Sequence, residues 1–298
     1  MKKILITGGA GFVGYHLAKE LAKKKYQVHI FDVHKNNVIK VKNFIKGDIS
    51  NLAHVLKACK GMDGIIHLAA VSRVSAAHEA PNKCIDINVK GTANVLEAAR
   101  LSNKKPWVIT SSSQEVQYDW NKHQGNNNLK NIKNLYGISK FMAEFLCHQY
   151  FQEYDLRVMV LRFTYVYGSK HDNPDKVVPK LISRALKGET IVVHQSAPQF
   201  DFIHFKDILK GICLAIQYAE KRKKPFFQQA DLKTESLTHL KKIAQIIVKE
   251  TQSSSKISYV KSVSPGRVPR SKTVKNILGF KAKYSIKQGI TETVKEFI

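Results

Sequence analysis

The sequence predicts an α/β protein with a doubly wound parallel sheet, followed by a smaller C-terminal α/β domain. Three observations lead to this prediction. Short apolar runs alternate with helical patterns as far as Gly168, a glycine-rich turn directly follows the first run, and the order of elements loosens beyond Gly168. Strands that alternate with helices pair in parallel and are covered by helices on both faces.

The strands of the predicted sheet are brief and apolar. They cover residues 3–7, 27–32, 44–48, 64–68, 107–111 and 156–161. The helices expected between them cover residues 13–21, 51–59, 81–100 and 139–151. Because parallel crossovers are right-handed, these elements favour a Rossmann sheet. Farther along the chain we expect helices at 177–186 and 207–219 and a short strand at 191–194.

The chain of 298 residues carries a formal net charge of +26, from 49 basic and 23 acidic residues. Its basic residues are spread along the sequence, and the densest runs, 23–25 and 221–224, resemble the polar ends of helices. A solvated lysine-rich surface is therefore the favoured interpretation. No nucleic-acid-binding module is recognisable and no apolar run approaches the length of a membrane helix, so we expect neither partner. A positive field would still attract an anionic cofactor and substrate.

The cysteines indicate reduced thiols in a cytoplasmic protein. There are four of them, Cys59, Cys84, Cys147 and Cys213, and none is close to another in the sequence. No Cys-x-x-Cys pair and no Cys/His spacing typical of a metal site is present, so we predict no metal.

The strongest local signal is the segment TGGAGFVG at residues 7–14. It places Gly8, Gly11 and Gly14 between a strand and a helix. Gly8 permits a tight turn, Gly11 lets the backbone approach a pyrophosphate, and Gly14 lets the helix pack closely on the strand. The helix N-terminus adds free N–H groups and the positive end of its dipole. A dinucleotide site is therefore predicted here.

Asp32 ends the second predicted strand, where a carboxylate can accept hydrogen bonds from an adenosine ribose and would repel a 2′-phosphate. We therefore expect NAD rather than NADP, although Lys35 lies near enough to weigh against this choice. Asp48 follows the third strand. It either faces the adenine or caps the helix that begins after Ser50.

Tyr136 and Lys140 stand four residues apart at the start of a predicted helix and so share one face. A phenol is a poor base at neutral pH, but a nearby ammonium favours the phenolate. Such a pair can accept a proton from a hydroxyl while hydride leaves the same carbon. Ser111, Ser112 and Ser113 follow the fifth strand, at the carboxyl end of the sheet where ligands bind.

Together these segments resemble the extended short-chain dehydrogenase/reductase family, specifically its nucleotide-sugar epimerases and dehydratases. The resemblance covers nearly the full chain. Besides the glycine turn, Asp32, Gly47-Asp48 and the serine run, it includes HLAA at 67–70, NVKGT at 88–92, YGISK at 136–140, Leu161-Arg162, Tyr167-Gly168, Val178-Pro179, DFIH at 201–204 and LGF at 278–280.

The resemblance implies a role for each site residue. Ser113 would hydrogen-bond the reacting sugar oxygen, Tyr136 would be the acid/base, and Lys140 would bind the nicotinamide ribose and tune Tyr136. The cofactor site would be lined by Gly8, Gly11, Phe12, Val13, Asp32, Asp48, Ile49, Leu68, Ala69, Ala70 and Asn88, together with Tyr136 and Lys140. Residues 1–168 would form the NAD-binding Rossmann domain. Residues 169–298 would form mainly the substrate-binding domain, with some segments returning to the first.

This chain departs from the family pattern at several positions. Glu115 stands where dehydratases carry the base that removes the C5 proton, but Gln114 replaces the acid, and an amide cannot protonate a departing hydroxyl. Tyr165 replaces a usual Asn, Phe200 replaces a usual Arg, and Ser264 replaces another Arg. The usual residues contact the substrate's diphosphate, so their loss removes charge-assisted hydrogen bonds.

The main prediction is an NAD-dependent epimerase (an isomerase) that acts on a nucleotide-activated sugar through a transient 4-keto intermediate. A 4,6-dehydratase or decarboxylase that uses Glu115 is the close alternative. A simple dehydrogenase that releases NADH is another. A non-catalytic NAD sensor is the alternative from a different class, and the Tyr136/Lys140 pair speaks against it. By analogy with the family we expect a cytoplasmic homodimer formed through helices 81–100 and 139–151.

Overall fold

The computed structural model describes residues 1–35, 43–116, 132–194, 199–260 and 276–298. The chain divides into two compact units, and each is described by itself. The first unit draws on residues within 1–162, 211–231 and 270–279, and the second draws on residues within 163–210, 232–269 and 280–298. The chain therefore passes between the units more than once.

The first unit contains a seven-stranded sheet, and six of its strands lie where the alternating sequence pattern predicted strands. Its order is β10-β6-β5-β4-β1-β2-β3. The strands are β1 (Lys3–Thr7), β2 (Gln27–Asp32), β3 (Phe44–Lys46), β4 (Gly64–His67), β5 (Trp107–Ser113), β6 (Arg157–Phe163) and β10 (Phe226–Leu232). Strand β1 pairs in parallel with both β2 and β4, so the strand order reverses direction at β1. Ligands bind at such a reversal in doubly wound sheets.

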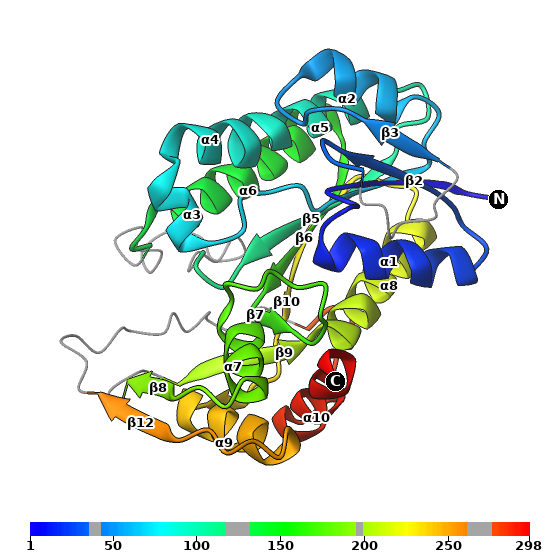
Figure 1. The fold of residues 1–298 in the computed structure, drawn as a ribbon. Helices are drawn as coiled ribbons and strands as arrows, with labels where there is room; N and C mark the ends of the chain where they lie inside the picture. The colour runs from blue at the N-terminus through cyan, green and yellow to red at the C-terminus, as the bar shows by residue number, and fades with distance from the viewer. Residues whose placement is uncertain (36–42, 117–131, 195–198, 261–275) are drawn as a thin grey trace. The chain divides into compact units, whose positions relative to one another are not determined.

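Helices cover both faces of this sheet (Figure 1). They are α1 (Phe12–Lys23), α2 (Leu52–Cys59), α3 (Val74–Glu79), α4 (Pro81–Ile85), α5 (Gly91–Leu101), α6 (Leu135–Tyr154) and the later turns of α8 (Phe205–Lys221). The predicted helix at 81–100 is interrupted by a π-helical turn, Asp86–Lys90. Helix α6 begins four residues earlier than predicted, because Asn134 caps it.

One hydrophobic core lies between the sheet and helices α2, α5 and α6. The strands contribute Leu5, Ile65 and Val108, and the helices contribute Val55 and Leu96, among other buried residues. These side chains are at most 1% exposed. The burial of such apolar surface is the main stabilising contribution to the sheet and fixes the strand ends that carry the site.

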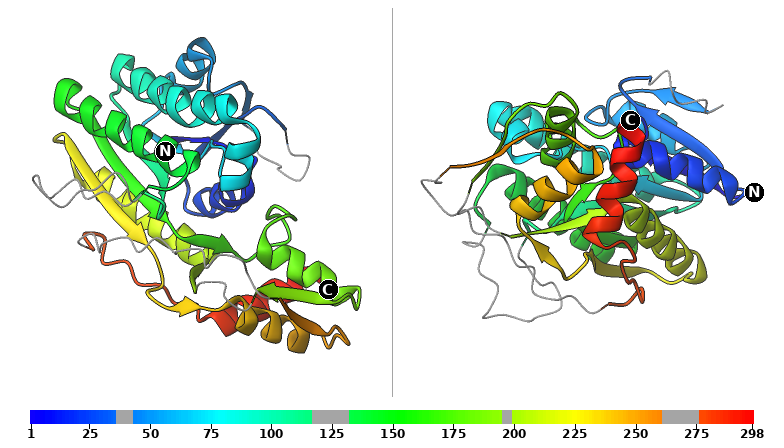
Figure 2. Two further views of the ribbon diagram at one scale, coloured as in Figure 1. Left: turned by 90° about the vertical axis from the view of Figure 1, so that its left-hand side faces the viewer. Right: turned by 60° about the horizontal axis from the view of Figure 1, so that its bottom comes forward.

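In its described residues, the second unit has two small sheets and three helices of its own. The strand orders are β11-β9-β7 and β12-β8. Its elements are β7 (Tyr165–Tyr167), α7 (Val177–Leu186), β8 (Ile191–His194), β9 (Phe200–His204), β11 (Leu237–Thr238), α9 (Leu240–Glu250), β12 (Ile257–Val260) and α10 (Ile286–Phe297). Helices α9 and α10 lie side by side (Figure 2). A separate core joins Ile182, Ile191, Ile247 and Ile290.

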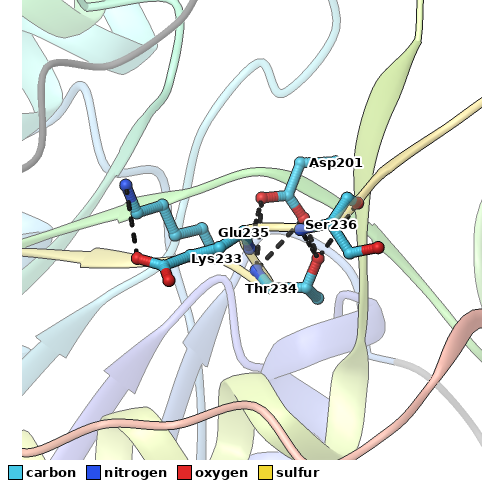
Figure 3. Close-up of polar contacts among 5 residues, drawn as sticks. All are labelled: Asp201, Lys233, Thr234, Glu235 and Ser236. Carbon is cyan, nitrogen blue, oxygen red and sulfur yellow. Dashed lines mark hydrogen bonds and ion pairs between the residues drawn. The ribbon is translucent and has the colours of Figure 1, made fainter.

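A buried carboxylate holds one turn of the second unit in place. The Asp201 side chain accepts hydrogen bonds from the Thr234 hydroxyl at 2.6 Å and from the backbone N–H groups of Thr234 and Glu235 (Figure 3). Burial raises the pKa of Asp201, and these hydrogen bonds act in the opposite direction. Glu235 has a positive φ of 65°, so the turn is a tight one. In the described part of the chain, no helix is long and apolar enough to span a membrane.

Candidate active site

The glycine turn joins β1 to α1 and allows close contact with the segment that follows β4. Gly8 has φ +67°, and a Cβ built there would lie 2.6 Å from the backbone nitrogen of Ala69. A Cβ on Gly14 would overlap the carbonyl oxygen of Gly8. A side chain at Gly14 would therefore push the helix away from the turn, and one at Gly8 would push the turn away from the segment after β4.

The start of α1 fits an anionic cofactor. Gly11 is its N-cap, and no side chain caps the helix. The first N–H groups of such a helix have no intrahelical partner and carry positive partial charge. Phe12 and Val13, the first helical residues, are half-buried, and Gly11 is exposed. The turn thus provides the donors and the space that a pyrophosphate needs.

Asp32, at the end of β2, lies next to this turn. Its carboxylate accepts a hydrogen bond from the N–H of Ala10 at 3.0 Å and a longer one from that of His34 at 3.3 Å. A carboxylate has about four acceptor sites, so oxygen lone pairs are left for a ribose hydroxyl. Lys35 is exposed, and among the described residues it forms no ion pair with Asp32.

Asp48 is exposed, and its carboxylate accepts hydrogen bonds from the N–H and the hydroxyl of Ser50, both at 2.8 Å. These bonds lower the pKa of Asp48, so the group is charged at neutral pH. The alternative that Asp48 caps the next helix is wrong, because Asn51 is the N-cap of α2. The following residue, Ile49, is buried, and its carbonyl accepts from Asn94.

The three predicted catalytic residues come together at the end of β5 and the start of α6. Ser113 is 7% exposed and lowers the pKa of Tyr136, so the two side chains interact. Lys140, one helical turn after Tyr136, is 6% exposed and donates to the carbonyl of Ser111 at 3.0 Å. The serine run and the Tyr-x-x-x-Lys pair therefore form one cluster.

Burial dominates the acid–base properties of this cluster. It raises the pKa of Tyr136 to about 12, while the Ser113 hydrogen bond acts in the opposite direction. Burial also lowers the pKa of Lys140 to about 8, and Glu144 partly offsets this shift. We expected the Lys140 ammonium to lower the pKa of Tyr136. In the structure Ser113 does so, because Lys140 points its amine at Ser111.

Glu115 belongs to the same cluster. Its pKa is raised by burial and lowered by a hydrogen bond from Asn134. Its negative charge raises the pKa of Tyr136, which shows that the two groups interact. Gln114 is 6% exposed. The carboxylate rather than the amide is therefore the group next to the tyrosine that can exchange a proton.

The predicted cofactor-lining residues after β4 are held by a buried polar chain. Leu68, Ala69 and Ala70 are half-buried. The Asn88 amide accepts from the Val71 N–H at 2.8 Å and donates to the Val71 carbonyl and to the Ser139 hydroxyl. Asn88 is 1% exposed, so its contacts tie this loop to α6.

His67 links Asn88 to the glycine turn. Its Nε2 lies 3.1 Å from the Thr92 hydroxyl, which donates to the Asn88 carbonyl, so Nε2 carries the hydrogen. Its Nδ1 then accepts from the Thr7 hydroxyl at 2.7 Å, and Thr7 accepts in turn from the Ala69 N–H at 3.4 Å. Burial lowers the pKa of His67 to about 3, which keeps this neutral tautomer.

A buried ion pair behind Lys140 was not among the predicted site residues. Glu144 accepts two hydrogen bonds from Arg162, at 2.8 and 2.6 Å, and one from Ser112 at 2.5 Å. The Glu144 and Arg162 side chains are only 1% and 2% exposed. The signal in the sequence was the spacing of Glu144, one helical turn beyond Lys140.

The departures at Tyr165 and Phe200 lie on neighbouring strands of the second unit, β7 and β9. Both side chains are half-buried, and Phe202 completes the ring cluster. The third departure, Ser264, lies outside the described residues.

Comparisons with known proteins agree with the fold and the motifs. A model described as the NAD dependent epimerase/dehydratase family matches residues 4–227. A UDP-N-acetyl-alpha-D-glucosaminuronate decarboxylase of Bacillus cytotoxicus is 30% identical over 99% of this chain and 98% of its own length. A human dTDP-D-glucose 4,6-dehydratase is 26% identical over 99% of this chain and 89% of its own length.

The fold also matches solved structures. A UDP-glucose 4-epimerase from Thermotoga maritima superposes with a TM-score of 0.82 and 23% identity, over 99% of this chain and 98% of that one. A dTDP-glucose 4,6-dehydratase from Streptomyces venezuelae has the same TM-score at 22% identity, over 99% and 96%. The chain belongs to the NAD-dependent epimerase/dehydratase family. It is an NAD-dependent enzyme, and the predicted resemblance is confirmed.

Proposed function

We propose that this enzyme epimerises a nucleotide-activated sugar at C4 through a transient 4-keto intermediate. The observation that carries the proposal is the cluster of Ser113, Tyr136 and Lys140, in which Ser113 interacts with Tyr136 and lowers its pKa. Two neighbouring hydroxyls can both reach one sugar oxygen, which is the arrangement that proton transfer at that oxygen needs.

Each residue of the cluster has a separate role. Bound NAD supplies the acceptor and donor of a hydride. The Tyr136 phenolate would take the proton of the sugar's 4-hydroxyl as hydride leaves C4, and the phenol so formed would return it when hydride comes back, while the Ser113 hydroxyl orients the same oxygen. Lys140, with a pKa of about 8, is mostly protonated at neutral pH and would supply a positive charge at the cofactor's ribose. The 4-keto sugar rotates within the site, so that hydride returns to the opposite face of C4.

The cofactor would be held by the residues at the strand ends of the first unit. The uncapped start of α1 would bind the pyrophosphate through Gly11, Phe12 and Val13, and Gly8 gives it room. Asp32 would accept from the adenosine ribose. The remaining contacts would come from Asp48, Ile49, Leu68, Ala69, Ala70, Asn88, Tyr136 and Lys140.

Glu115 favours decarboxylation of a nucleotide-linked uronic acid as the second candidate. Oxidation at C4 would make a β-keto acid, the C5–C6 bond would break to release CO2, and Glu115 would give a proton to C5. Its raised pKa suits a proton donor. Gln114 weighs against a 4,6-dehydratase, since its amide has no proton to give to a leaving hydroxyl. A decarboxylase is also among the relatives that align over nearly the full chain.

Proton NMR of the protein with NAD and a panel of UDP-, dTDP-, GDP- and CDP-sugars, uronic acids included, tests these candidates. An epimeric sugar is the expected product. A pentose with release of CO2 would assign the decarboxylase, and a 4-keto-6-deoxy sugar would assign the dehydratase. NAD binding without any turnover would contradict the epimerase proposal and support the sensor.

We also propose a cytoplasmic homodimer. Cys59, Cys84, Cys147 and Cys213 are all free thiols, as in reduced compartments. On α6, Met142 and Phe145 are 40% and 46% exposed and lie on one face of the helix. An apolar pair of this kind fits a helical dimer interface. Phe145→Lys should then convert the dimer to a monomer in light scattering, and an unchanged mass would contradict this interface.

A further inference from the structure

The side-chain amide of Asn134 forms two hydrogen bonds, one through its oxygen and one through its nitrogen. Its Oδ1 accepts a hydrogen bond from the Gly137 N–H at 2.8 Å, which caps α6. Its Nδ2 donates to Oε2 of Glu115 at 3.1 Å. The same side chain therefore fixes the start of the catalytic helix and the carboxylate that lies next to it.

The surrounding backbone leaves Glu115 little freedom. Its N–H donates to the Ser113 hydroxyl at 3.2 Å, so its main chain is held by a catalytic residue. A Cβ built on Gly137 would lie 3.3 Å from the Glu115 Cβ, which shows how closely α6 approaches it. Asn134 supplies the remaining restraint, at the tip of the side chain.

We propose that Asn134 is a positioning residue that orients the Glu115 carboxylate toward the reacting sugar. The inference rests on the second candidate of the proposed function, decarboxylation, in which Glu115 gives a proton to C5. Among the residues that cap helices well, aspartate has no donor for Glu115, and serine is one group shorter. Asparagine both caps the helix and donates to a carboxylate.

The charges near Glu115 determine how far loss of the Asn134 hydrogen bond should shift the pKa of Glu115. Among the described residues, the titratable group that interacts with it is Tyr136, and no described lysine, arginine or histidine forms an ion pair with it. Loss of the Asn134 donor should raise the pKa of Glu115, and a carboxylate at the same position should raise it further.

Carboxyl titration by 13C NMR of the full-length protein tests the proposal without any substrate. Asn134→Ser and Asn134→Asp both keep a capping group, and Glu115→Gln identifies the Glu115 signal. We expect the pKa of Glu115 to rise by about half a unit or more in the serine variant and by about one unit or more in the aspartate variant. Asn51→Ser is the matched control, since Asn51 caps α2 through an acceptor bond alone.

A Glu115 titration that is unchanged in both folded Asn134 variants would overturn the proposal, and so would an equal shift in Asn51→Ser. The pH profile of kcat/KM is measured on the same proteins. The limb of this profile that reports the ionisation of Glu115 should shift by the same amount as the pKa measured by NMR. It should be absent in Glu115→Gln. An NMR shift combined with undiminished turnover of Glu115→Gln would leave the contact standing but refute the role of Glu115 in the proposed function.

Discussion

The ring of Phe200 meets the ring of Tyr165 edge to face, with centroids 4.9 Å apart and planes at 85°. Tyr165 and Phe200, which both depart from the family pattern, thus pack against each other. An Asn at 165 and an Arg at 200 would place an amide and a charge here. This chain instead has an aromatic pair, which favours contact with apolar surface or with the face of a ring over contact with phosphate oxygens.

This contact should appear as an interaction energy. A double-mutant cycle of Tyr165→Leu and Phe200→Leu should give about 0.5–1.5 kcal/mol of coupling in the free energy of unfolding, because edge-to-face pairs contribute that much beyond their buried area. Urea denaturation of the four proteins measures it. Strictly additive losses would show that the rings pack independently.

The acid/base role of Tyr136 predicts that Tyr136→Phe loses turnover by a factor of about 10² to 10⁴, the usual contribution of a positioned proton donor. NAD affinity should stay within a few-fold, since the ring is retained. Single-turnover kinetics and calorimetry measure the two effects. Tyr150→Phe on the same helix is the control, because its hydroxyl donates to Glu97 instead. Substantial activity in Tyr136→Phe would refute the role.

Alanine substitutions at Gly8 and Gly61 distinguish the cost of a steric clash from the cost of a positive φ. Both have positive φ, 67° and 75°, but a Cβ at Gly61 meets nothing within 4 Å, whereas one at Gly8 meets Ala69. Gly61→Ala should therefore cost only the backbone strain of about 1–2 kcal/mol. Gly8→Ala should cost more and weaken NAD binding at least tenfold. Equal unfolding energies and equal NAD affinities would contradict the close approach in the structure.

His204 should make the protein sensitive to acid. It is 1% exposed, neither ring nitrogen has a hydrogen-bond partner among the described residues, and it stacks on Tyr284. Burial, together with the charge of Lys206, lowers its pKa to about 4, although Glu292, Asp207 and Glu296 oppose the shift. The folded state thus favours the neutral ring. Its contribution is complete above pH 6.5 and is lost as the pH falls toward 4.

His204→Phe tests this expectation. The variant should lose less stability than the native protein between pH 6.5 and 4, by at most ~3 kcal/mol. Above pH 7 it should be at least as stable, because two unpaired nitrogens are removed. Urea midpoints across this range measure both effects. Parallel pH profiles for the two proteins would show that His204 does not drive the acid sensitivity.

Much of the fold could be predicted because its signals are local. The apolar runs and the glycines at 8, 11 and 14 lie within short segments, and they fix β1, α1 and their neighbours. Strand β10 was not predicted. Its sequence, FFQQADL, lacks a continuous apolar run, since it lies at the edge of the sheet. Tyr136, Lys140 and Ser113 could be found because their spacing and position after a strand are visible in the sequence.

The rest of the site depends on contacts between distant positions. Asn134 lies 19 residues from Glu115, and in the sequence it is one polar residue at the end of a polar stretch. Arg162 lies 18 residues from Glu144 and ends a run of apolar residues. A sequence shows that such side chains exist, but only folding brings each donor to its acceptor.

The hydrogen-bonded series Thr7, His67 and Thr92 limits which substitutions the sequence can accept at these positions. Each hydrogen along it has a single acceptor, so a change at one position leaves a buried donor or acceptor without a partner. Such a group costs about 1–3 kcal/mol of stability, which disfavours changes that remove one of the three polar side chains alone. We expect an engineered sequence that accepts one new residue at 67 to require compensating changes at 7 and 92.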